Sequence, residues 1–389
     1  MNKNFFGIFI AQQSTTFKNI ELIIENYSKT DTNEFIFINQ SNIYNNNLDD
    51  FIKIKDKYIY KFKKPIIKVN NPYSPSLFIK VIYFIKIKIF LGKYLKKAKF
   101  VCFSPGGFIE GEIARIVKKN GGKVIQIEGG LPNDLINNKS RNEEIKKTKI
   151  YYKLPFKRFS SNPRIDPLVH VDYFISSGQI SKKMHETLGY NDAKILDIGI
   201  PRFENLIGKK SATNYQVTKV DNLIYIAGAY EFHNEKKQSE KMLSDIKEIY
   251  KFLNNKKEIL FQVKLHPRQS NNEINKIVNE IKAEIINNDQ KFQEVVFKNS
   301  IAITRYSNLA YELLYQNIPT FFYKPPTLEF KQITLPDKNL VINNKLELEK
   351  LLNDSEKLIN LNYSEYAKLF YSKNTPNSSS LITKLLVEG

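Results

Sequence analysis

The stretch Ile259-Leu260-Phe261-Gln262-Val263-Lys264-Leu265-His266-Pro267-Arg268 decides the fold of this chain. It is a mostly apolar run that ends in a His-Pro pair. This predicts a buried strand that stops sharply, because proline lacks an N–H and holds the residue before it in extended geometry. A lysine-rich helical pattern to about Leu253 precedes the run, and a second helical pattern follows Gln269. Strands that alternate with helices are typical of a largely parallel sheet covered on both faces.

The same alternation recurs along the chain and predicts two α/β domains. A polar stretch at 208–220 separates them, so we expect a first Rossmann-like domain over residues 1–210 and a second over residues 221–389. The predicted strands are Phe5–Ile10, Phe35–Asn39, Pro65–Val69, Phe100–Phe103, Lys123–Glu128, Tyr173–Ser176, Lys194–Ile198, Leu223–Ala227, Ile259–Leu265, Val295–Phe297, Ile301–Thr304, Thr320–Tyr323 and Leu340–Ile342. The last forty residues predict helices with a Ser-rich break at Asn377–Ser380.

Two such domains with parallel sheets facing a central cleft describe the GT-B architecture. Flavodoxin-like or epimerase-like domain pairs give the same string of elements, so the fold alone does not decide the function.

The composition excludes several classes of protein. With 42% hydrophobic and 13% aromatic residues the chain is not disordered, although its net charge is +20. Cys102 is the single cysteine, so neither an intrachain disulfide nor a cysteine-based zinc site can form. The sequence has no Asp-x-Asp motif at a convincing strand end and no His-Glu-x-x-His or Gly-x-Ser-x-Gly pattern. We therefore expect no metal and no cofactor.

The location is predicted from apolar runs and from charge. Only six apolar residues, Phe5–Ile10, follow the N-terminal polar residues, which is too few for a signal peptide, and no run approaches the ~20 residues of a spanning helix. We expect a cytoplasmic protein at the inner face of the cytoplasmic membrane. No zinc-finger, RRM or bZIP pattern accompanies the basic charge, so we expect no nucleic acid partner.

Residues 51–100 carry most of the excess charge, with fourteen lysines and one acid, Asp56. Within them, Ser74-Pro75-Ser76 predicts a helix start, and Leu77–Tyr94 mixes Ile, Phe and Tyr with lysines. This predicts a helix that lies on an anionic membrane surface. A half-buried helix with solvated lysines is the alternative, and the alternation in Phe84–Ile89 also permits a strand.

The loop after Ile259–Leu265 is the first candidate site. His266 at a strand end can donate a hydrogen bond to a phosphate oxygen, and Lys264 and Arg268 add positive charge beside Pro267. The alternative is that the His-Pro pair only ends the strand.

Arg305-Tyr306-Ser307-Asn308 is the second candidate and opens an amphipathic helix that buries Leu309 and Leu313. Ser307 is the expected N-cap, and a helix N-terminus offers N–H groups to a phosphate. Glu312, one turn further in, can reach a ribose or can be a surface residue. Gly228, after the first strand of the second domain, is a further candidate for nucleotide contact. An ordinary helix cap is the alternative to a ligand site.

Glu128 ends a buried strand of the first domain and is followed by Gly129, Gly130 and, a few residues later, Asn133. An acid there can act as a general base on an acceptor hydroxyl, and the glycines let the acceptor approach closely. Asp134 is the nearest competitor, and a carboxylate at a strand end can also just cap a neighbouring helix.

In the order and approximate spacing of these motifs over residues 123–320, the chain resembles GT-B bacterial sialyltransferases of glycosyltransferase family 52 and the capsule polysialyltransferases. Those enzymes share an acidic-acidic-Gly segment, a His-Pro motif and a Ser-Ser/Thr motif. Here the segments read Ile127-Glu128-Gly129, His266-Pro267 and Ser307-Asn308. The resemblance implies Glu128 as general base and a CMP-activated sialic acid donor, although Asn308 departs from the pattern.

A second resemblance comes from Tyr173-Phe174-Ile175-Ser176-Ser177-Gly178 followed by Asp197-Ile198-Gly199-Ile200-Pro201-Arg202. With Tyr306-Ser307 and a later Pro319, this order is similar to CDP-glycerol and related polyol-phosphate transferases. Such enzymes also use histidine-bearing loops for the pyrophosphate.

The sequence thus predicts an inverting, metal-independent glycosyltransferase of surface polysaccharide, capsule or lipooligosaccharide biosynthesis. We expect a nucleotide sugar, CMP-linked sialic acid or a related sugar, as donor, a glycan or glycolipid as acceptor, and a homodimer as one arrangement. Catalysis would rest on Glu128 and His266. The alternatives are a CDP-glycerol-type transferase, a UDP-hexose transferase, a sugar-nucleotide epimerase and a non-catalytic capsule assembly subunit.

Overall fold

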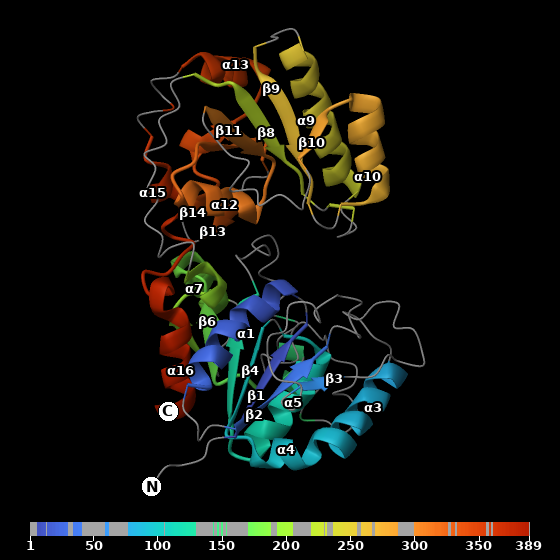
Figure 1. Cartoon of the computed structure of the whole chain (residues 1–389), viewed down its shortest axis with the longest axis vertical. Coiled ribbons are helices and arrows are strands. Elements are labelled where there is room, and N and C mark those ends of the chain that lie inside the picture. The colour runs from blue at the N-terminus through green and yellow to red at the C-terminus, as the bar shows by residue number, and fades with distance from the viewer. Residues whose placement is uncertain are drawn as a thin grey trace. The chain divides into compact units, whose positions relative to one another are not determined.

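The computed structural model (Figure 1) shows two compact units, Met1–Gly208 with Leu369–Gly389, and Lys209–Lys368. The residues that it describes are 6–12, 14–29, 34–40, 59–61, 77–104, 106–129, 143, 146–147, 149–150, 153, 170–187, 193–204, 219–228, 230–231, 236–254, 258–266, 269–286, 299–325, 328–330, 333–354, 358 and 361–388. Among these residues, no helix has both the length and the apolar character needed to cross a membrane.

The first unit is built on a parallel sheet of seven strands in the order β3-β2-β1-β4-β5-β6-β7. The strands are β1 Phe6–Ala11, β2 Glu34–Asn39, β3 Ile59–Lys61, β4 Phe100–Ser104, β5 Lys123–Ile127, β6 Tyr173–Ser176 and β7 Lys194–Asp197. The chain adds strands on one side of β1 and then on the other, so the strand order reverses between β1 and β4. This is the doubly wound order of Rossmann-like domains.

Helices connect these strands. They are α1 Ser14–Tyr27, α5 Phe108–Lys119, α7 Gln179–Thr187, the short η7 Pro201–Phe203, and a continuous run of α3 Leu77–Lys86, η3 Ile87–Leu91 and α4 Gly92–Lys97. The helix predicted from Leu77 is confirmed, and the alternative strand through Phe84–Ile89 is wrong. The predicted helix start at Ser74–Ser76 lies outside the described residues.

An aromatic cluster forms the core beneath β1. The ring of Phe9 packs edge-on against the rings of Tyr27, Phe35 and Phe100 at 5.5–5.8 Å between centroids. A Cβ on Gly7 would lie 2.2 Å from the Phe100 ring. Glycine at this position therefore makes room for the ring that joins β1 to β4.

The second unit contains a parallel sheet of six strands in the order β10-β9-β8-β11-β12-β15. These are β8 Asn222–Ile226, β9 Leu260–Lys264, β10 Glu284–Ile286, β11 Ser300–Thr304, β12 Thr320–Tyr323 and β15 Val341–Ile342; β13 Leu328–Phe330 and β14 Ile333–Leu335 form a separate hairpin. The expected α/β class with two Rossmann-like parallel sheets is confirmed. The predicted strands Pro65–Val69 and Val295–Phe297 lie outside the described residues.

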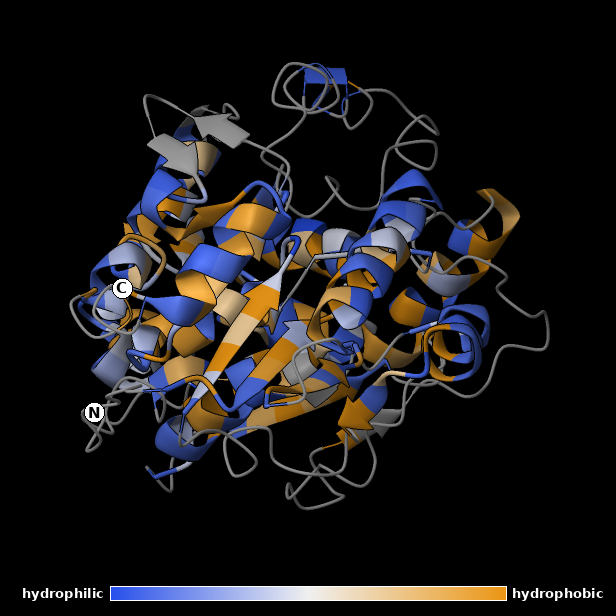
Figure 2. Ribbon diagram, turned by 90° about the horizontal axis from the view of Figure 1, so that it is seen from above, coloured by the Kyte–Doolittle hydropathy of each residue, from blue (hydrophilic) through white to orange (hydrophobic). Residues whose placement is uncertain are grey.

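The helices of the second unit are α9 Lys236–Asn254, α10 Asn271–Asn275, η8 Lys276–Ile281, α12 Asn308–Tyr315, η9 Lys338–Leu340, α13 Lys345–Asn353 and α15 Tyr363–Ala367. Figure 2 shows strands that are hydrophobic along most of their length and helices on which hydrophobic and hydrophilic residues alternate. Strands buried on both faces and helices with one buried side produce this difference.

The C-terminal segment corrects the predicted second domain, which was expected to run to residue 389. Residues from Leu369 onward, including η10 Thr375–Asn377 and α16 Ser378–Glu388, belong to the first unit, where α16 packs against α1 (Figure 1). The predicted Ser-rich break is instead the start of α16. The carboxylate of Glu204 accepts hydrogen bonds from the Ser378 hydroxyl (3.0 Å) and from the Ser379 backbone N–H, which caps this helix.

Two glycines of the first unit make room for the returning segment. A Cβ on Gly178 would lie 2.5 Å from the backbone carbonyl carbon of Phe370, and one on Gly199, whose φ is +91°, would meet Thr375 at 2.2 Å. The hydroxyl of Ser372 and the side-chain amide of Asn374 donate to the carbonyl of Asp197 at 3.0 and 3.1 Å. Close backbone approach and polar contacts thus dock the C-terminal segment on β6 and β7.

We expect Gly178→Ala to lower the free energy of unfolding by about 1–3 kcal/mol, because the new methyl group meets immobile backbone. Gly92→Ala is the matched control: outside its own stretch of helix no atom lies within 4 Å of its Cβ position, and its φ is −54°. In a helix this change should raise stability by about 0.5–1 kcal/mol. Urea unfolding measures both, and a Gly178→Ala variant as stable as the wild type would contradict the docking.

Candidate functional site

The carboxyl edge of the second sheet brings three predicted segments together. The strand order reverses between β8 and β11, because β9 and β10 lie on one side of β8 and β11, β12 and β15 on the other. Ile226 at the end of β8 pairs in register with Lys264 of β9 and with Thr304 of β11. The three strands therefore end at one level. Open α/β sheets bind ligands outside such a reversal point.

His266 lies two residues past β9 and is half-buried. Its backbone N–H donates to the side-chain oxygen of Gln269 (3.2 Å), and the Gln269 N–H donates to the His266 carbonyl (2.9 Å). The Gln269 side-chain amide also donates to the carbonyl of Gly228 (3.3 Å). One glutamine thus links the loop after β9 to the loop after β8 and sets the position of His266 relative to Gly228.

Glu273 holds the side chain of Gln269 in place. It is fully buried, and its carboxylate accepts hydrogen bonds from Gln269 (2.6 Å) and from the Ser239 hydroxyl of α9. Ser270 caps α10 and forms a capping box with Glu273. Gln269 and Glu273 were not among the predicted site residues, although the Ser-x-x-Glu spacing of the capping box is a recognisable sequence signal.

The N-terminus of α12 forms the third part of this edge. Ser307 is the N-cap, as predicted, and its hydroxyl accepts the backbone N–H of Leu309 at 3.3 Å. Asn308 is the first helical residue, and Glu312 lies one turn further in. The hydroxyl of Tyr230 donates to the Tyr306 carbonyl (3.4 Å), so the segments after β8 and β11 are in contact. N–H groups of this first turn carry the positive end of the helix dipole.

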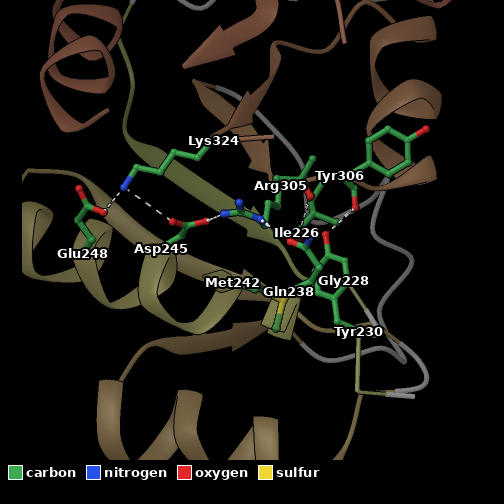
Figure 3. A network of polar contacts seen from close by, with 11 residues as sticks. Ile226, Gly228, Tyr230, Gln238, Met242, Asp245, Glu248, Arg305, Tyr306 and Lys324 are labelled. Carbon is green, nitrogen blue, oxygen red and sulfur yellow. Dashed lines mark hydrogen bonds and ion pairs between the residues drawn. The ribbon is translucent and has the colours of Figure 1, made fainter. Parts of the chain in front are cut away.

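Arg305 lies at the same edge, but its guanidinium group turns toward α9 (Figure 3). Its Nη1 atom lies 2.5 Å from Oδ2 of Asp245, and Lys324 approaches Oδ1 of the same carboxylate at 3.8 Å. The side chains of Arg305 and Asp245 are 10% and 5% exposed, so this is a buried ion pair. Burial raises the pKa of Asp245, and the charge of Arg305 opposes that rise. Arg305, which we predicted to bind the nucleotide, therefore holds β11 against α9.

Several predicted residues lie outside the described part of the chain: Pro267, Arg268, Gly130, Asn133 and the competitor Asp134. Their proposed roles stay predictions. Lys264 is 8% exposed, and its carbonyl accepts the backbone N–H of Ala227 at 3.0 Å.

Glu128 follows β5 in the first unit and is held firmly. Its Oε2 atom accepts the Ser177 backbone N–H (2.8 Å) and the Ser181 hydroxyl (2.6 Å), and its Oε1 atom lies 3.2 Å from Nε2 of His185. Glu128 is 7% exposed, and Gly129 beside it is partly exposed. The contacts explain why an acid is placed here, and they add His185 of α7, which our sequence analysis did not single out. The role of Glu128 as general base stays a prediction.

A second polar cluster lies where the first sheet reverses, between β1 and β4. The Gln12 side-chain amide donates to Oε1 of Glu110 at 3.1 Å, and both side chains are buried. Glu110 lies in the first turn of α5, just past Gly106 and Gly107. Burial raises the pKa of Glu110 to about 7, while a hydrogen bond from its own backbone N–H and one from the Gln12 side chain oppose the rise. A buried carboxyl group that titrates near neutral pH therefore lies just after this glycine pair.

Comparison with known proteins identifies the family. The profile of CDP-glycerol:poly(glycerophosphate) glycerophosphotransferases matches residues 93–332, which is more than half of the 389 residues. The chain belongs to this family. Its members are transferases, and the matched span runs from β4 and β5 in the first unit through all of β8 to β12 in the second. No curated protein sequence matches this transferase significantly.

Solved structures similar to this transferase share its GT-B-like two-domain fold. UDP-GlcNAc 2-epimerase from Neisseria meningitidis, bound to UDP-GlcNAc, superposes with a TM-score of 0.56 at 15% identity, covering 99% of this chain and 100% of the epimerase. A putative UDP-N-acetylglucosamine 2-epimerase from Listeria monocytogenes gives 0.58 at 13%, covering 99% and 98%. The wall teichoic acid polymerase TagF, soaked with CDPG, gives 0.51 at 16%, covering 98% and 88%.

We expect Arg305→Met to lower the free energy of unfolding by about 3–5 kcal/mol, because it leaves the Asp245 carboxylate buried without its main partner. The double variant Asp245→Asn/Arg305→Met should recover most of this loss. Urea unfolding tests both. An Arg305→Met variant as stable as the wild type would refute the structural role, and loss of nucleotide binding in the stable double variant would give Arg305 a ligand role as well.

The titration of Glu110 predicts a pH dependence. The pKa of about 7 in the folded state exceeds the value of 4.5 expected when unfolded, so the native state binds the extra proton. The contribution of Glu110 to the free energy of unfolding should be fully present below about pH 4.5 and should be lost as the pH rises through about 7. Glu110→Gln should therefore be more stable than the wild type by about 2–3 kcal/mol at about pH 8, with little difference at about pH 4.

Urea unfolding at the two pH values measures this gain. Glu112→Gln on the same helix is the control, because it removes the ion pair with Arg115 at 2.7 Å and should bring no gain at either pH. A Glu110→Gln variant less stable than the wild type at about pH 8 would show that the carboxylate is ionised and stabilising.

Proposed function

We propose that this transferase moves a polyol phosphate, with glycerol phosphate as the first candidate, from a CDP-activated donor to an acceptor hydroxyl. The observation that carries the proposal is the family match over residues 93–332. The match includes Gly228, His266 and Ser307, which come from three loops and meet at one sheet edge. The donor class is thus proposed from the family, and the place where it binds from the strand topology.

The second unit is the proposed nucleotide site. The diphosphate would lie at the N-terminus of α12, where backbone N–H groups and the Asn308 side chain can donate hydrogen bonds. His266 would donate to a phosphate oxygen, and Lys264 would add positive charge near it. Gly228 would let the nucleotide approach the end of β8 closely. Gln269 acts as a positioning residue, since it holds the backbones of His266 and Gly228 together.

The reaction forms one phosphorus–oxygen bond and breaks another. The acceptor hydroxyl attacks the phosphorus that carries the polyol, the bond from that phosphorus to the bridging oxygen breaks, and CMP departs with the bridging oxygen. The hydroxyl proton passes to a general base, for which Glu128 remains our prediction. His266 and the end of α12 would stabilise the negative charge that develops on the departing CMP. The chain's own groups can supply this stabilisation without a metal.

The motif-based prediction of a CMP-sialic acid donor shares CMP as the leaving group with this proposal. Nothing in the family match favours a sialic acid, and Asn308 departs from the Ser-Ser/Thr motif. The similarity to UDP-GlcNAc 2-epimerases is a similarity of fold at 13–15% identity. We therefore favour a CDP-activated polyol phosphate as the donor.

Binding and turnover test the proposal together. We expect CDP to raise the melting temperature more than UDP or GDP at matched concentration, because ligand that binds only the native state stabilises it. CMP should be released from CDP-glycerol in the presence of a glycerol-phosphate acceptor, with or without EDTA. His266→Ala should lower turnover by roughly 10²–10³-fold with the fold intact, as for loss of a transition-state hydrogen bond.

His170→Ala is the matched control. His170 precedes β6 in the first unit, and burial lowers its pKa to about 4, so it is neutral at pH 7. Its replacement should leave nucleotide binding unchanged. A preference for UDP, or release of CMP from CMP-sialic acid but not from CDP-glycerol, would refute the proposed donor, and full turnover in a folded His266→Ala variant would refute the site.

A further inference from the structure

One helical run of the first unit exposes an unusual amount of apolar surface. Eleven large apolar side chains are exposed in the described part of the chain, and five of them lie between Leu77 and Phe90. Phe78, Ile85, Ile89 and Phe90 are 63%, 51%, 69% and 55% exposed. Single exposed apolar residues are ordinary on protein surfaces, but a cluster of this kind marks an interaction site.

The other face of the same run is packed into the unit. Tyr83, Ile87, Leu91 and Leu95 are at most 2% exposed and recur every four residues. The run contacts α5, and the rings of Tyr83 and Phe108 meet edge-on at 5.7 Å between centroids. The helix is therefore fixed by one stripe, and Phe78, Ile85 and Ile89, at spacings of seven and four, share the opposite face. The exposed face is therefore part of the surface of the folded unit.

The charged residues of this helical run are all basic. Residues 77–99 contain seven lysines and no acid. Lys88, Lys93, Lys96 and Lys97 are exposed, and they follow or flank the apolar residues along the helix. Lysine stems can lie along an apolar surface while the ammonium groups reach a polar layer. Apolar side chains with flanking lysines thus match the layers of an anionic bilayer, which are hydrocarbon and then phosphate.

A second copy of the chain fits this face less well. In a two-fold symmetric dimer the same surface meets itself, so the lysines of both copies would be brought together without acids to pair with them. Nucleic acid would satisfy the lysines, but it offers no hydrocarbon phase to Ile85 and Ile89. Both remain as outcomes of the test.

We propose that residues Leu77–Lys97 form an in-plane anchor that binds the surface of an anionic lipid bilayer. The half from Leu77 to Phe90 inserts its apolar side chains among the acyl chains near the headgroups. Lys88 and the lysines of the half that follows contact lipid phosphates. This proposal is independent of the transfer chemistry, because it rests on exposure and charge in the first unit alone.

Sedimentation of the full chain with lipid vesicles tests the anchor. Vesicles of equal parts phosphatidylcholine and phosphatidylglycerol should bind the protein, those of phosphatidylcholine alone should bind at least about tenfold more weakly, and high salt should weaken binding. Ile85→Ser/Ile89→Ser/Phe90→Ser should lower the partition coefficient at least about tenfold. Lys88→Gln/Lys93→Gln/Lys96→Gln/Lys97→Gln should do the same, since each lysine near the surface contributes roughly fivefold.

Matched variants elsewhere in the chain control for general effects. Leu346→Ser/Val278→Ser removes two apolar side chains that are 68% and 41% exposed in the second unit. Lys237→Gln/Lys241→Gln/Lys247→Gln/Lys251→Gln neutralises four exposed lysines of α9. Both variants should bind vesicles like the wild type, and circular dichroism and melting should show that all four variants are folded.

Three results would overturn the anchor. The first is equal binding of the wild type and the folded helix variants to anionic vesicles. The second is a dimer, detected by light scattering, that the serine variant abolishes while vesicle binding is absent. The third is tight binding to DNA or RNA without binding to vesicles. Failure of CDP-glycerol turnover would leave the vesicle result unaffected, so the two proposals fail separately.

Discussion

The parallel pairing of β8 with β9 and β11 is the constraint on which the site depends. Because parallel strands all end at the same edge, three loops separated by some forty residues each come to one level, with Ile226 in register with both Lys264 and Thr304. The reversal of strand order between β8 and β11 keeps a helix from crossing directly over this point. Gly228, His266 and the Ser307 cap are neighbours for this reason alone.

The polar residues around this edge have two different roles: some stabilise the fold, and others form the candidate site. Asp245, Glu273 and Arg305 are buried, and each is satisfied by partners within the unit: the ion pair of Arg305 with Asp245, and the hydrogen bonds that Glu273 accepts from Gln269 and Ser239. A buried group left without a partner is costly, so these residues are used to join α9 and α10 to the sheet. His266 and the first turn of α12 remain at the edge. Charge that looks functional in a sequence is thus partly structural.

The glycine motifs of the second family resemblance also have a structural task. Gly178 and Gly199 make room for Phe370 and Thr375, so the C-terminal segment can pack on β6 and β7 and continue into α16. The stretches that carry this resemblance accordingly mark the place where the end of the chain returns to its first unit. Glu128 is tied into the same region through Ser177 and Ser181. The acid, the glycines and the returning segment therefore form one connected region of the fold.

The sequence by itself determined the order of strands and helices, the two-unit α/β class, the Ser307 cap and the helix that begins at Leu77, since each is written in a local pattern of apolar spacing or capping residues. It missed β3, β10, β13 and β14, because each has only three residues, which are too few to show a pattern. Only the tertiary structure decided that Arg305 pairs with Asp245, that Gln269 joins two loops, and that the chain end leaves the second unit for the first. Each of these depends on contacts between residues some 40 to 190 positions apart. The folded backbone brings such partners together, so no local sequence pattern can indicate the contact.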